Sequence, residues 1–345
     1  MEDYPDRFSN EGELDEFLTR PRPELVEFVR TLSGPLLLLG VGGKMGPTLA
    51  ILARRAALAA GRRLEITAAS RFSQPGLRRL LEEYDIRTIP CDLMEEKSLA
   101  RLPDAENVVY LVGLKFGTTQ DPAATWAVNT LPPAHTVRRF PESRIAALSS
   151  GSLYPLVPVS GGGAREDHPL TPLGEYSNAC VARERIFGYF SARNQTRMAL
   201  LRLFYAVEMR YGVLVDIARK VWNCETVDLA MGYLNWIWQG DANELILRSL
   251  DLAEAPAAAY NLTHPQPVAV RDIALRFGEL LDRPVRLDGT EAPTALLGDP
   301  SRICSRLGPP PTSLDRVMRW IGCWMKQGGV LLGKPTHFEV RDGRY

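Results

Sequence analysis

A glycine-rich loop near the start of the chain has the residue types and spacing of a phosphate-binding turn. Glycines let the backbone turn sharply and approach a pyrophosphate closely, and the first N–H groups of a following helix attract the anion. Three of the glycines have G-x-x-G-x-x-G spacing, and the alternative G-x-G-x-x-G form would require a glycine in place of Met45. We therefore predict a dinucleotide site here, with an ordinary glycine turn as the alternative. The candidate contacts are Gly40, Gly42, Gly43, Lys44, Met45 and Gly46.

The next expected strand ends at Ser70 and Arg71. An NAD-selective fold usually places an acidic residue at this point, where it binds the ribose 2′-hydroxyl. A serine and a guanidinium suit a 2′-phosphate better, because arginine can bind a phosphate through two parallel hydrogen bonds. The prediction is therefore NADP, with NAD as the alternative if Arg71 is only a surface residue at a strand end.

The segments around these residues alternate between strand-like and helix-like patterns. Short apolar runs predict buried strands at 36–39, 64–70, 107–113, 144–150 and 198–204. Helical spacing predicts helices at 23–32, 47–61, 74–84 and 121–140, and a long helix that begins at Thr171-Pro172, where proline suits the first turn. The alternation predicts an α/β fold built on a doubly wound parallel sheet, the Rossmann fold.

The character of the sequence divides the chain into three parts. A polar N-terminal extension occupies 1–33, and the dinucleotide-binding Rossmann domain occupies 34–205. After about residue 206 the elements become shorter and are punctuated by proline. We interpret 206–345 mainly as a smaller C-terminal α/β substrate domain, with some elements returning to the Rossmann sheet.

Composition argues against several classes of protein. The 345 residues include 41 lysines and arginines and 41 aspartates and glutamates, so no excess of charge favours nucleic acid or an anionic membrane. No apolar run approaches the roughly 18 residues needed to cross a bilayer, and the acidic N-terminus lacks the features of a secretory signal. The five cysteines are scattered, which predicts neither disulfides nor a metal site. The expected location is the cytoplasm.

Several further motifs follow one another along the chain. They are Asp92-Leu93, Val112-Gly113-Leu114-Lys115, Asn129, Ser149 through Tyr154, Tyr260-Asn261-Leu262 and Asp299 through Gly308. In this order they resemble the extended short-chain dehydrogenase/reductase family, also called the NAD-dependent epimerase/dehydratase family, over about residues 35–325. The resemblance implies that Asp92 and Leu93 contact the adenine. It also implies further cofactor contacts at Val112, Gly113, Lys115 and Asn129.

The catalytic motif of that family is altered in this chain. The family uses Tyr-x-x-x-Lys on one helix, and the matching residues here are Tyr176 and Cys180. The resemblance implies that Tyr176 is the general acid/base and contacts the cofactor, and that Ser150 polarises the reacting oxygen. In the family the lysine holds the ribose and lowers the tyrosine pKa. Cys180 cannot supply that charge, and Lys115 is a candidate substitute.

The resemblance also implies a homodimer. Family members commonly pair the helices near 122–139 and 172–193, which would bury Trp126, Val137, Ile186 and Phe187 between two copies. The small-molecule partner would be of the carbohydrate type. Trp236 and Trp238 could stack on a sugar, but core packing is the preferred interpretation.

Together these patterns predict an NADP- or NAD-dependent oxidoreductase or epimerase that acts on a sugar, sugar acid or nucleotide sugar by hydride transfer. The alternative is a catalytically silenced dinucleotide-binding protein, a sensor or scaffold. Cys180 stands where the family has its lysine, and catalysis needs that lysine more than cofactor binding does. The sequence does not distinguish a nucleotide sugar from a simple one.

Overall fold

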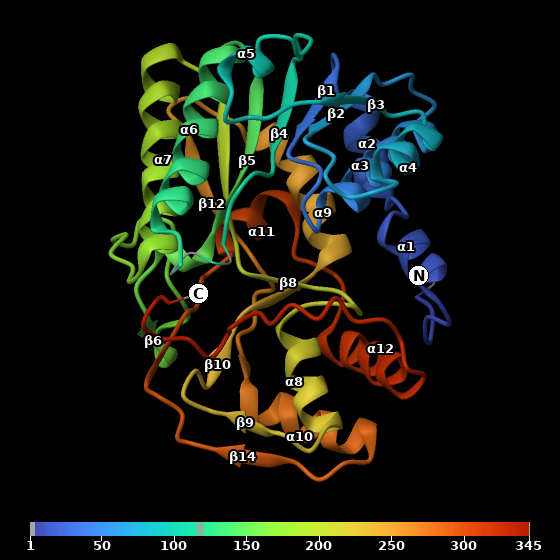
Figure 1. Cartoon of the computed structure of the whole chain (residues 1–345), viewed down its shortest axis with the longest axis vertical. Coiled ribbons are helices and arrows are strands. Elements are labelled where there is room, and N and C mark those ends of the chain that lie inside the picture. The colour runs from blue at the N-terminus through green and yellow to red at the C-terminus, as the bar shows by residue number, and fades with distance from the viewer. Residues whose placement is uncertain (1–3, 116, 118–119, 345) are drawn as a thin grey trace.

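The computed structural model describes residues 4–115, 117 and 120–344. A seven-stranded sheet fills the upper part of the molecule in the view of Figure 1. All its strand pairs are parallel, in the order β12-β7-β5-β4-β1-β2-β3. These strands are β1 Leu36–Leu39, β2 Ile66–Ser70, β3 Arg87–Pro90, β4 Asn107–Tyr110, β5 Arg144–Ser150, β7 Met198–Leu203 and β12 Ala258–Leu262.

Both faces of this sheet are covered by helices, which explains the continuous apolar strands. Leu36 and Leu38 of β1 pack into one core, and Leu37 and Leu39 pack into the other, because successive side chains of a strand point to opposite faces. Helices α2 Pro23–Thr31, α3 Gly46–Ala59, α4 Leu77–Glu83 and α9 Gln239–Arg248 cover the first face. Helices α5 Glu96–Leu99, α6 Pro122–Arg139 and α7 Glu175–Asn194 cover the second. The predicted doubly wound fold is confirmed.

A smaller lobe lies below the sheet in Figure 1 and is built around a separate apolar core. Its main helices are α8 Val213–Trp222, α10 Val270–Leu281 and α12 Leu314–Lys326, and α11 Ser301–Leu307 packs against β12. Trp236 and Trp238 are buried in the core of this lobe. Short strand pairs complete the fold: β6 Val157–Pro158 with β15 Thr294–Ala295, β8 Tyr205–Val207 with β11 Trp236–Trp238, β9 Thr226–Asp228 with β14 Arg286–Asp288, and β10 Tyr233–Leu234 with β13 Val268–Ala269.

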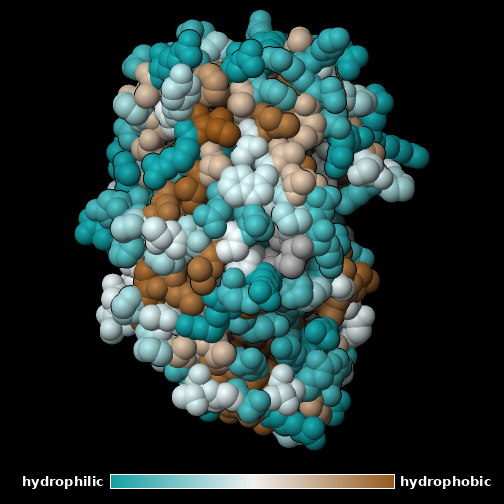
Figure 2. Space-filling model, turned by 60° about the vertical axis from the view of Figure 1, so that its left-hand side comes forward, coloured by the Kyte–Doolittle hydropathy of each residue, from teal (hydrophilic) through white to brown (hydrophobic). Residues whose placement is uncertain are grey.

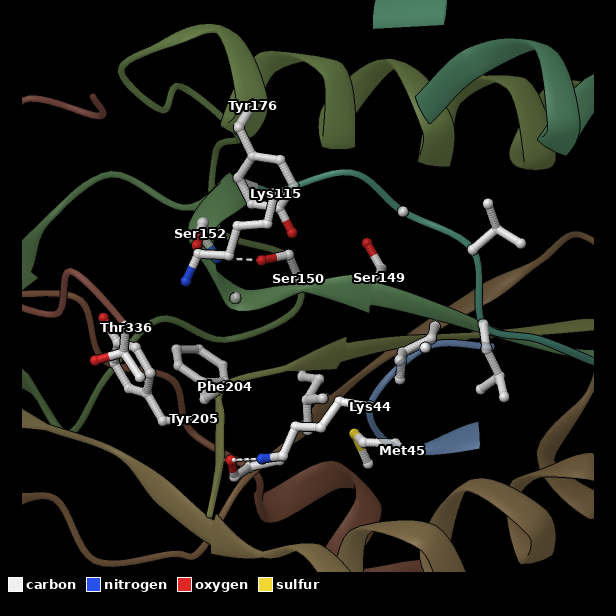
Figure 3. A pocket seen from close by; sticks show the side chains of 18 of the residues that line it. Lys44, Met45, Lys115, Ser149, Ser150, Ser152, Tyr176, Phe204, Tyr205 and Thr336 are labelled. Carbon is white, nitrogen blue, oxygen red and sulfur yellow. Dashed lines mark hydrogen bonds between the residues drawn. The ribbon is translucent and has the colours of Figure 1, made fainter. Parts of the chain in front are cut away.

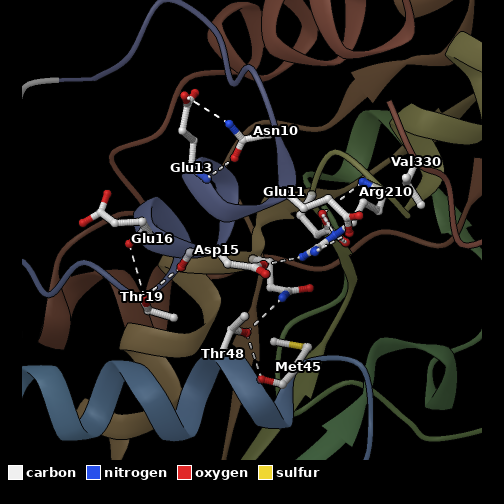
Figure 4. Close-up of polar contacts among 12 residues, drawn as sticks. Asn10, Glu11, Glu13, Asp15, Glu16, Thr19, Met45, Thr48, Arg210 and Val330 are labelled. Carbon is white, nitrogen blue, oxygen red and sulfur yellow. Dashed lines mark hydrogen bonds and ion pairs between the residues drawn. The ribbon is translucent and has the colours of Figure 1, made fainter. Parts of the chain in front are cut away.

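The N-terminal extension contains a helix that the sequence did not indicate, α1 Glu11–Leu18. It buries Leu14 and Leu18 and packs the partly buried Phe17 against the same core, which is too short an apolar pattern to stand out in the sequence. Both leucines are buried in the core of the smaller lobe. Arg210 donates to Asp15 at 2.8 Å and to Glu11 at 3.2 Å, which fixes the helix beside the start of α3 (Figure 4).

Two expectations about α7 and its surface are corrected. The helix begins at Glu175 rather than at Thr171-Pro172, because Gly174 has a φ of 83° and lies against Gly343. Val137 and Phe187 are fully buried between the helices and the sheet, so they are not available to a second copy.

The face that carries α6 and α7 has small hydrophobic areas within a hydrophilic surface (Figure 2). Trp126 on α6 and Tyr189 on α7 are exposed. The homodimer stays a prediction.

No helix in the described parts of the chain is long and apolar enough to cross a membrane.

A buried ion pair joins the central strands to α7. Arg202 of β7 donates to Glu184 of α7 at 2.7 Å, and only 5% of each side chain is exposed. Glu184 also accepts from Ser149 at 2.6 Å, and Arg202 donates to the Tyr154 hydroxyl at 2.5 Å. Tyr154 in turn donates to Asn261 of β12 at 2.9 Å. This network holds the carboxyl ends of β5, β7 and β12 in register with α7.

We expect Glu184→Gln to lower the free energy of unfolding by about 3–5 kcal/mol, because it leaves the Arg202 charge buried without its counterion. Denaturant unfolding followed by circular dichroism measures the change. Glu83→Gln is the control, because it removes an exposed pair with Arg79 and should cost less than about 1 kcal/mol. Equal stability of the two variants would contradict a structural role for the buried pair.

Candidate functional site

A cavity of about 280 Å³ lies at the carboxyl ends of the central strands. It sits where β1 separates β2 from β4, the point at which parallel α/β sheets bind their ligands. The cavity brings together ten of the residues predicted from the sequence. They are Gly40, Gly43, Lys44, Met45, Gly46, Val112, Gly113, Lys115, Ser150 and Tyr176.

The glycine loop needs glycine at different positions for different reasons. Gly40 has a φ of 86°, and a Cβ at Gly46 would overlap the backbone of Val41. The fold itself therefore requires both. A Cβ at Gly43 would meet only the Gly40 carbonyl oxygen, at an ordinary 3.7 Å, although Gly43 faces the cavity. Helix α3 has no side-chain cap, so its first N–H groups can bind an anion.

Two lysines reach the cavity from opposite sides (Figure 3). The Lys44 ammonium donates to the Ala206 carbonyl at 3.1 Å and lies 4.2 Å from the centre of the Tyr211 ring. The Lys115 ammonium lies 5.5 Å from the centre of the Tyr205 ring. Burial lowers the pKa of each lysine to about 8. An anionic ligand would stabilise both ammonium groups and raise these pKa values again.

Tyr176 and Ser150 face each other across the cavity wall (Figure 3). The Ser150 hydroxyl and the Cys180 thiol both lie close enough to the phenol to influence its pKa. Burial raises the pKa of Tyr176 well above its usual value, and the nearby Cys180 raises it further. Only 7% of Tyr176 is exposed, and that part lines the cavity. The phenol therefore needs a nearby positive charge before it can act as a base.

Cys180 is fully buried in an apolar cluster with Leu153 and Tyr176. Burial raises the pKa of its thiol, so the group is a neutral thiol at physiological pH. Cys180 therefore packs as a small apolar residue.

Other predicted cofactor residues lie outside the cavity lining. The Ser70 hydroxyl accepts from the Gly42 N–H at 3.2 Å and so supports the glycine loop. Arg71 is exposed just after β2 and has no ion-pair partner among the described residues. Asp92 accepts from the Met94 N–H at 3.0 Å, and Leu93 is buried in the core.

Asn129 is fully buried and holds protein groups rather than facing the cavity. Its amide donates to the Leu114 carbonyl at 3.0 Å and to the Thr125 carbonyl at 2.8 Å, and its oxygen accepts from Arg183. It therefore positions the loop that carries Gly113 and Lys115.

Sequence reasoning missed several residues that line the cavity, among them Arg183 and Thr336. Arg183 follows Tyr176 by seven positions on α7, so helical periodicity places both on one face. That spacing was a usable signal. Thr336 reaches the cavity from the C-terminal tail, where its N–H and hydroxyl donate to Asp216 at 2.7 and 2.6 Å. No periodic pattern in the tail could have indicated this contact.

One family model matches about half of the sequence, and several solved structures have a similar fold. Residues 36–207 match the model of the NAD dependent epimerase/dehydratase family. An epimerase from Methanothermobacter thermautotrophicus has a similar structure, with a TM-score of 0.71 and 15% identity over 89% of this chain and 96% of that chain. UDP-glucose 4-epimerase from Thermus thermophilus, solved with NAD, has a TM-score of 0.67 and 17% identity over 85% and 99%.

A dTDP-glucose 4,6-dehydratase from Streptomyces venezuelae, solved with NAD, has a TM-score of 0.68 and 16% identity over 85% of this chain and 97% of that chain. No curated protein matches the sequence. At these identities the similarity establishes the fold.

The glycine loop provides a test that separates folding from ligand binding. We expect Gly46→Ala to destabilise the protein by about 1–3 kcal/mol, because its Cβ has no room beside Val41. Gly43→Ala should leave stability within about 0.5 kcal/mol of wild type. It should nevertheless weaken dinucleotide binding at least tenfold, because its Cβ occupies the cavity side of the loop. Thermal unfolding and fluorescence titration measure the two effects, and unchanged affinity in Gly43→Ala would argue against a dinucleotide at this loop.

Proposed function

We propose that the chain is an NADP-dependent member of the epimerase/dehydratase family that transfers hydride at a hydroxyl-bearing carbon of a carbohydrate-type substrate. One observation carries the proposal: a single cavity contains the glycine loop at one side and the facing side chains of Tyr176 and Ser150 at the other (Figure 3). The match of 36–207 to the family model supports it.

The residues of the cavity fit a bound dinucleotide. Gly43, Lys44 and the uncapped N-terminus of α3 would hold the pyrophosphate, because they combine close backbone approach with positive charge. The bound cofactor would supply the hydride acceptor. Asp92 and Leu93 would lie toward the adenine, as the resemblance implies, and Gly113 would lie against the cofactor in the cavity.

Tyr176 would take the proton from a substrate hydroxyl as hydride leaves the carbon that bears it. Ser150 would donate a hydrogen bond to the same oxygen and fix its position between the two side chains. The remaining wall carries Lys115, Tyr205 and Thr336, whose polar groups suit the hydroxyls of a sugar or the carboxylate of a sugar acid.

The rival proposal is a silenced binding protein, which the absence of lysine at position 180 favours. The two proposals differ in one observable, net hydride transfer. A binder would retain a dinucleotide through purification, detectable by mass spectrometry, and would turn over no carbohydrate substrate.

We expect NADPH to bind more tightly than NADH. The exposed guanidinium of Arg71 follows β2 and can grip a 2′-phosphate, whereas an acidic residue there would repel it. Arg71→Ala should weaken NADPH binding by about tenfold or more and change NADH binding little. Arg87→Ala removes an exposed charge at the amino end of the neighbouring strand β3, whereas Arg71 follows the carboxyl end of β2, and it is the control. Equal wild-type affinity for both cofactors would refute the NADP assignment.

The acid/base role of Tyr176 is tested by Tyr176→Phe with a panel of sugars, sugar acids and nucleotide sugars. We expect kcat to fall by about 10²–10⁴, the usual contribution of a positioned acid/base, while cofactor affinity changes little. Tyr189→Phe makes the same change at an exposed site of α7 and should have no effect. A Tyr176→Phe variant with the wild-type rate would exclude the proposed mechanism.

A further inference from the structure

Arg183 is a buried cation that the proposed mechanism does not yet use. Its side chain is 3% exposed, and it lines the same cavity as Tyr176. Its terminal nitrogens donate to the Leu148 carbonyl at 3.1 Å and to the Asn129 side chain. Within the described residues, its Nε has no hydrogen-bond partner and no carboxylate forms an ion pair with it, because the adjacent Glu184 pairs with Arg202.

A buried guanidinium without an ion-pair partner is costly, because the desolvation of a charge amounts to several kcal/mol in a protein interior. The Glu184 carboxylate, which pairs with Arg202, acts on the Arg183 charge without forming an ion pair with it. A buried charge that lines a cavity marks a candidate functional site. The geometry of α7 shows which groups receive the charge. Tyr176, Cys180 and Arg183 have i, i+4 and i+7 spacing and therefore share one face of the helix.

The charged and titratable groups around the Tyr176 phenol come from three elements. Cys180 and Arg183 approach it along α7, and the Arg183 charge opposes the rise in the Tyr176 pKa caused by burial. Tyr110 of β4 lies near Arg183 and Cys180, and its buried hydroxyl has no hydrogen-bond partner in the described structure. Lys115, from the loop after β4, acts electrostatically on Cys180.

The space around the guanidinium is adapted to it. A Cβ at Gly113 would lie 2.8 Å from the Nη2 of Arg183, so a larger residue there would displace the end of the arginine side chain. The fully buried Cys180 is small and uncharged. A lysine at position 180 would instead place a second cation about one helical turn from Arg183, in the same buried cluster.

We propose that Arg183 supplies the fixed positive charge that stabilises the Tyr176 phenolate, and that a neutral residue at position 180 is the complement of this arginine. The inference rests on the proposed acid/base role of Tyr176. Arg183 is then a positioning residue that acts through the tyrosine. The proposed site differs from the Tyr-x-x-x-Lys arrangement in the residue that carries the positive charge. A cation acts on the tyrosine in both arrangements.

Arginine also has an advantage over lysine at a buried site. Burial lowers the pKa of Lys44 and Lys115 to about 8, so each would lose its charge in mildly alkaline solution. A guanidinium stays protonated throughout the working range of proteins. The positive charge beside the phenol is therefore constant under the conditions in which a phenolate base forms.

The test is the pH dependence of kcat for substrate oxidation between pH 6 and 10.5. A base must be deprotonated, so the rate rises with pH through the pKa of Tyr176, and loss of the cation moves this rise to higher pH. We expect Arg183→Met to shift it by about one pH unit or more and to reduce kcat at pH 7 at least tenfold. Arg183→Lys should shift it less, because the charge is kept.

Two variants that place a positive charge at position 180, with and without Arg183, distinguish an electrostatic role of this arginine from a structural one. Cys180→Lys alone should lower both kcat and the melting temperature, because two cations then share the cluster. Cys180→Lys combined with Arg183→Met should recover part of the activity lost in Arg183→Met, because one cation is restored beside the phenol. Lys115→Met is expected to weaken ligand binding without moving the pH dependence.

Two results would overturn the inference. One is an unshifted pH dependence in Arg183→Met, with thermal unfolding and cofactor titration showing a folded, loaded protein. The other is a tenfold increase in activity when Cys180→Lys is made in the presence of Arg183, which would mean that the wild-type site lacks a cation. If Arg183→Met does not fold, the Arg183→Lys profile and the Cys180→Lys result still decide the question. A Tyr176→Phe variant with full activity would reject the proposed function itself, which keeps the two failures distinct.

Discussion

The ion pair between Arg202 and Glu184 fixes the geometry on which the site depends. In a low-dielectric interior the pair is strong only if its remaining hydrogen-bonding capacity is used, and here Ser149 and Tyr154 use it. The pair ties α7 to β7, and the hydrogen bond from Ser149 to Glu184 ties α7 to the carboxyl end of β5. Because Tyr176 and Ser150 lie on these same two elements, the network also sets the position of one hydroxyl relative to the other.

The cavity is electrostatically one-sided. Lys44, Lys115 and Arg183 line it, and no aspartate or glutamate occurs among the described lining residues. Burial disfavours the charged form of each of these groups, so an anionic ligand would interact favourably with all three. This arrangement suits an anionic ligand, as the proposed dinucleotide would be.

Both ends of the described chain contribute to the smaller lobe. Leu14 of α1 and Phe338 of the tail are buried in the same core as Trp320. The tail also brings Thr336 to the cavity wall, where Asp216 holds it. The substrate side of the cavity is therefore assembled from segments that are far apart in the sequence, whereas the glycine loop and its helix are continuous.

The sequence by itself determined the fold class and the glycine loop after the first strand, because strand and helix periodicity and the conformational demands of glycine are local properties. Only the tertiary structure decided what each polar side chain contacts. It turned Asn129 inward to position a loop, buried Phe187 within one chain, started α7 at Glu175 and left Arg183 beside the phenol. These outcomes depend on partners many residues away in the sequence. The electrostatic effect of a buried charge depends on the groups that surround it in space.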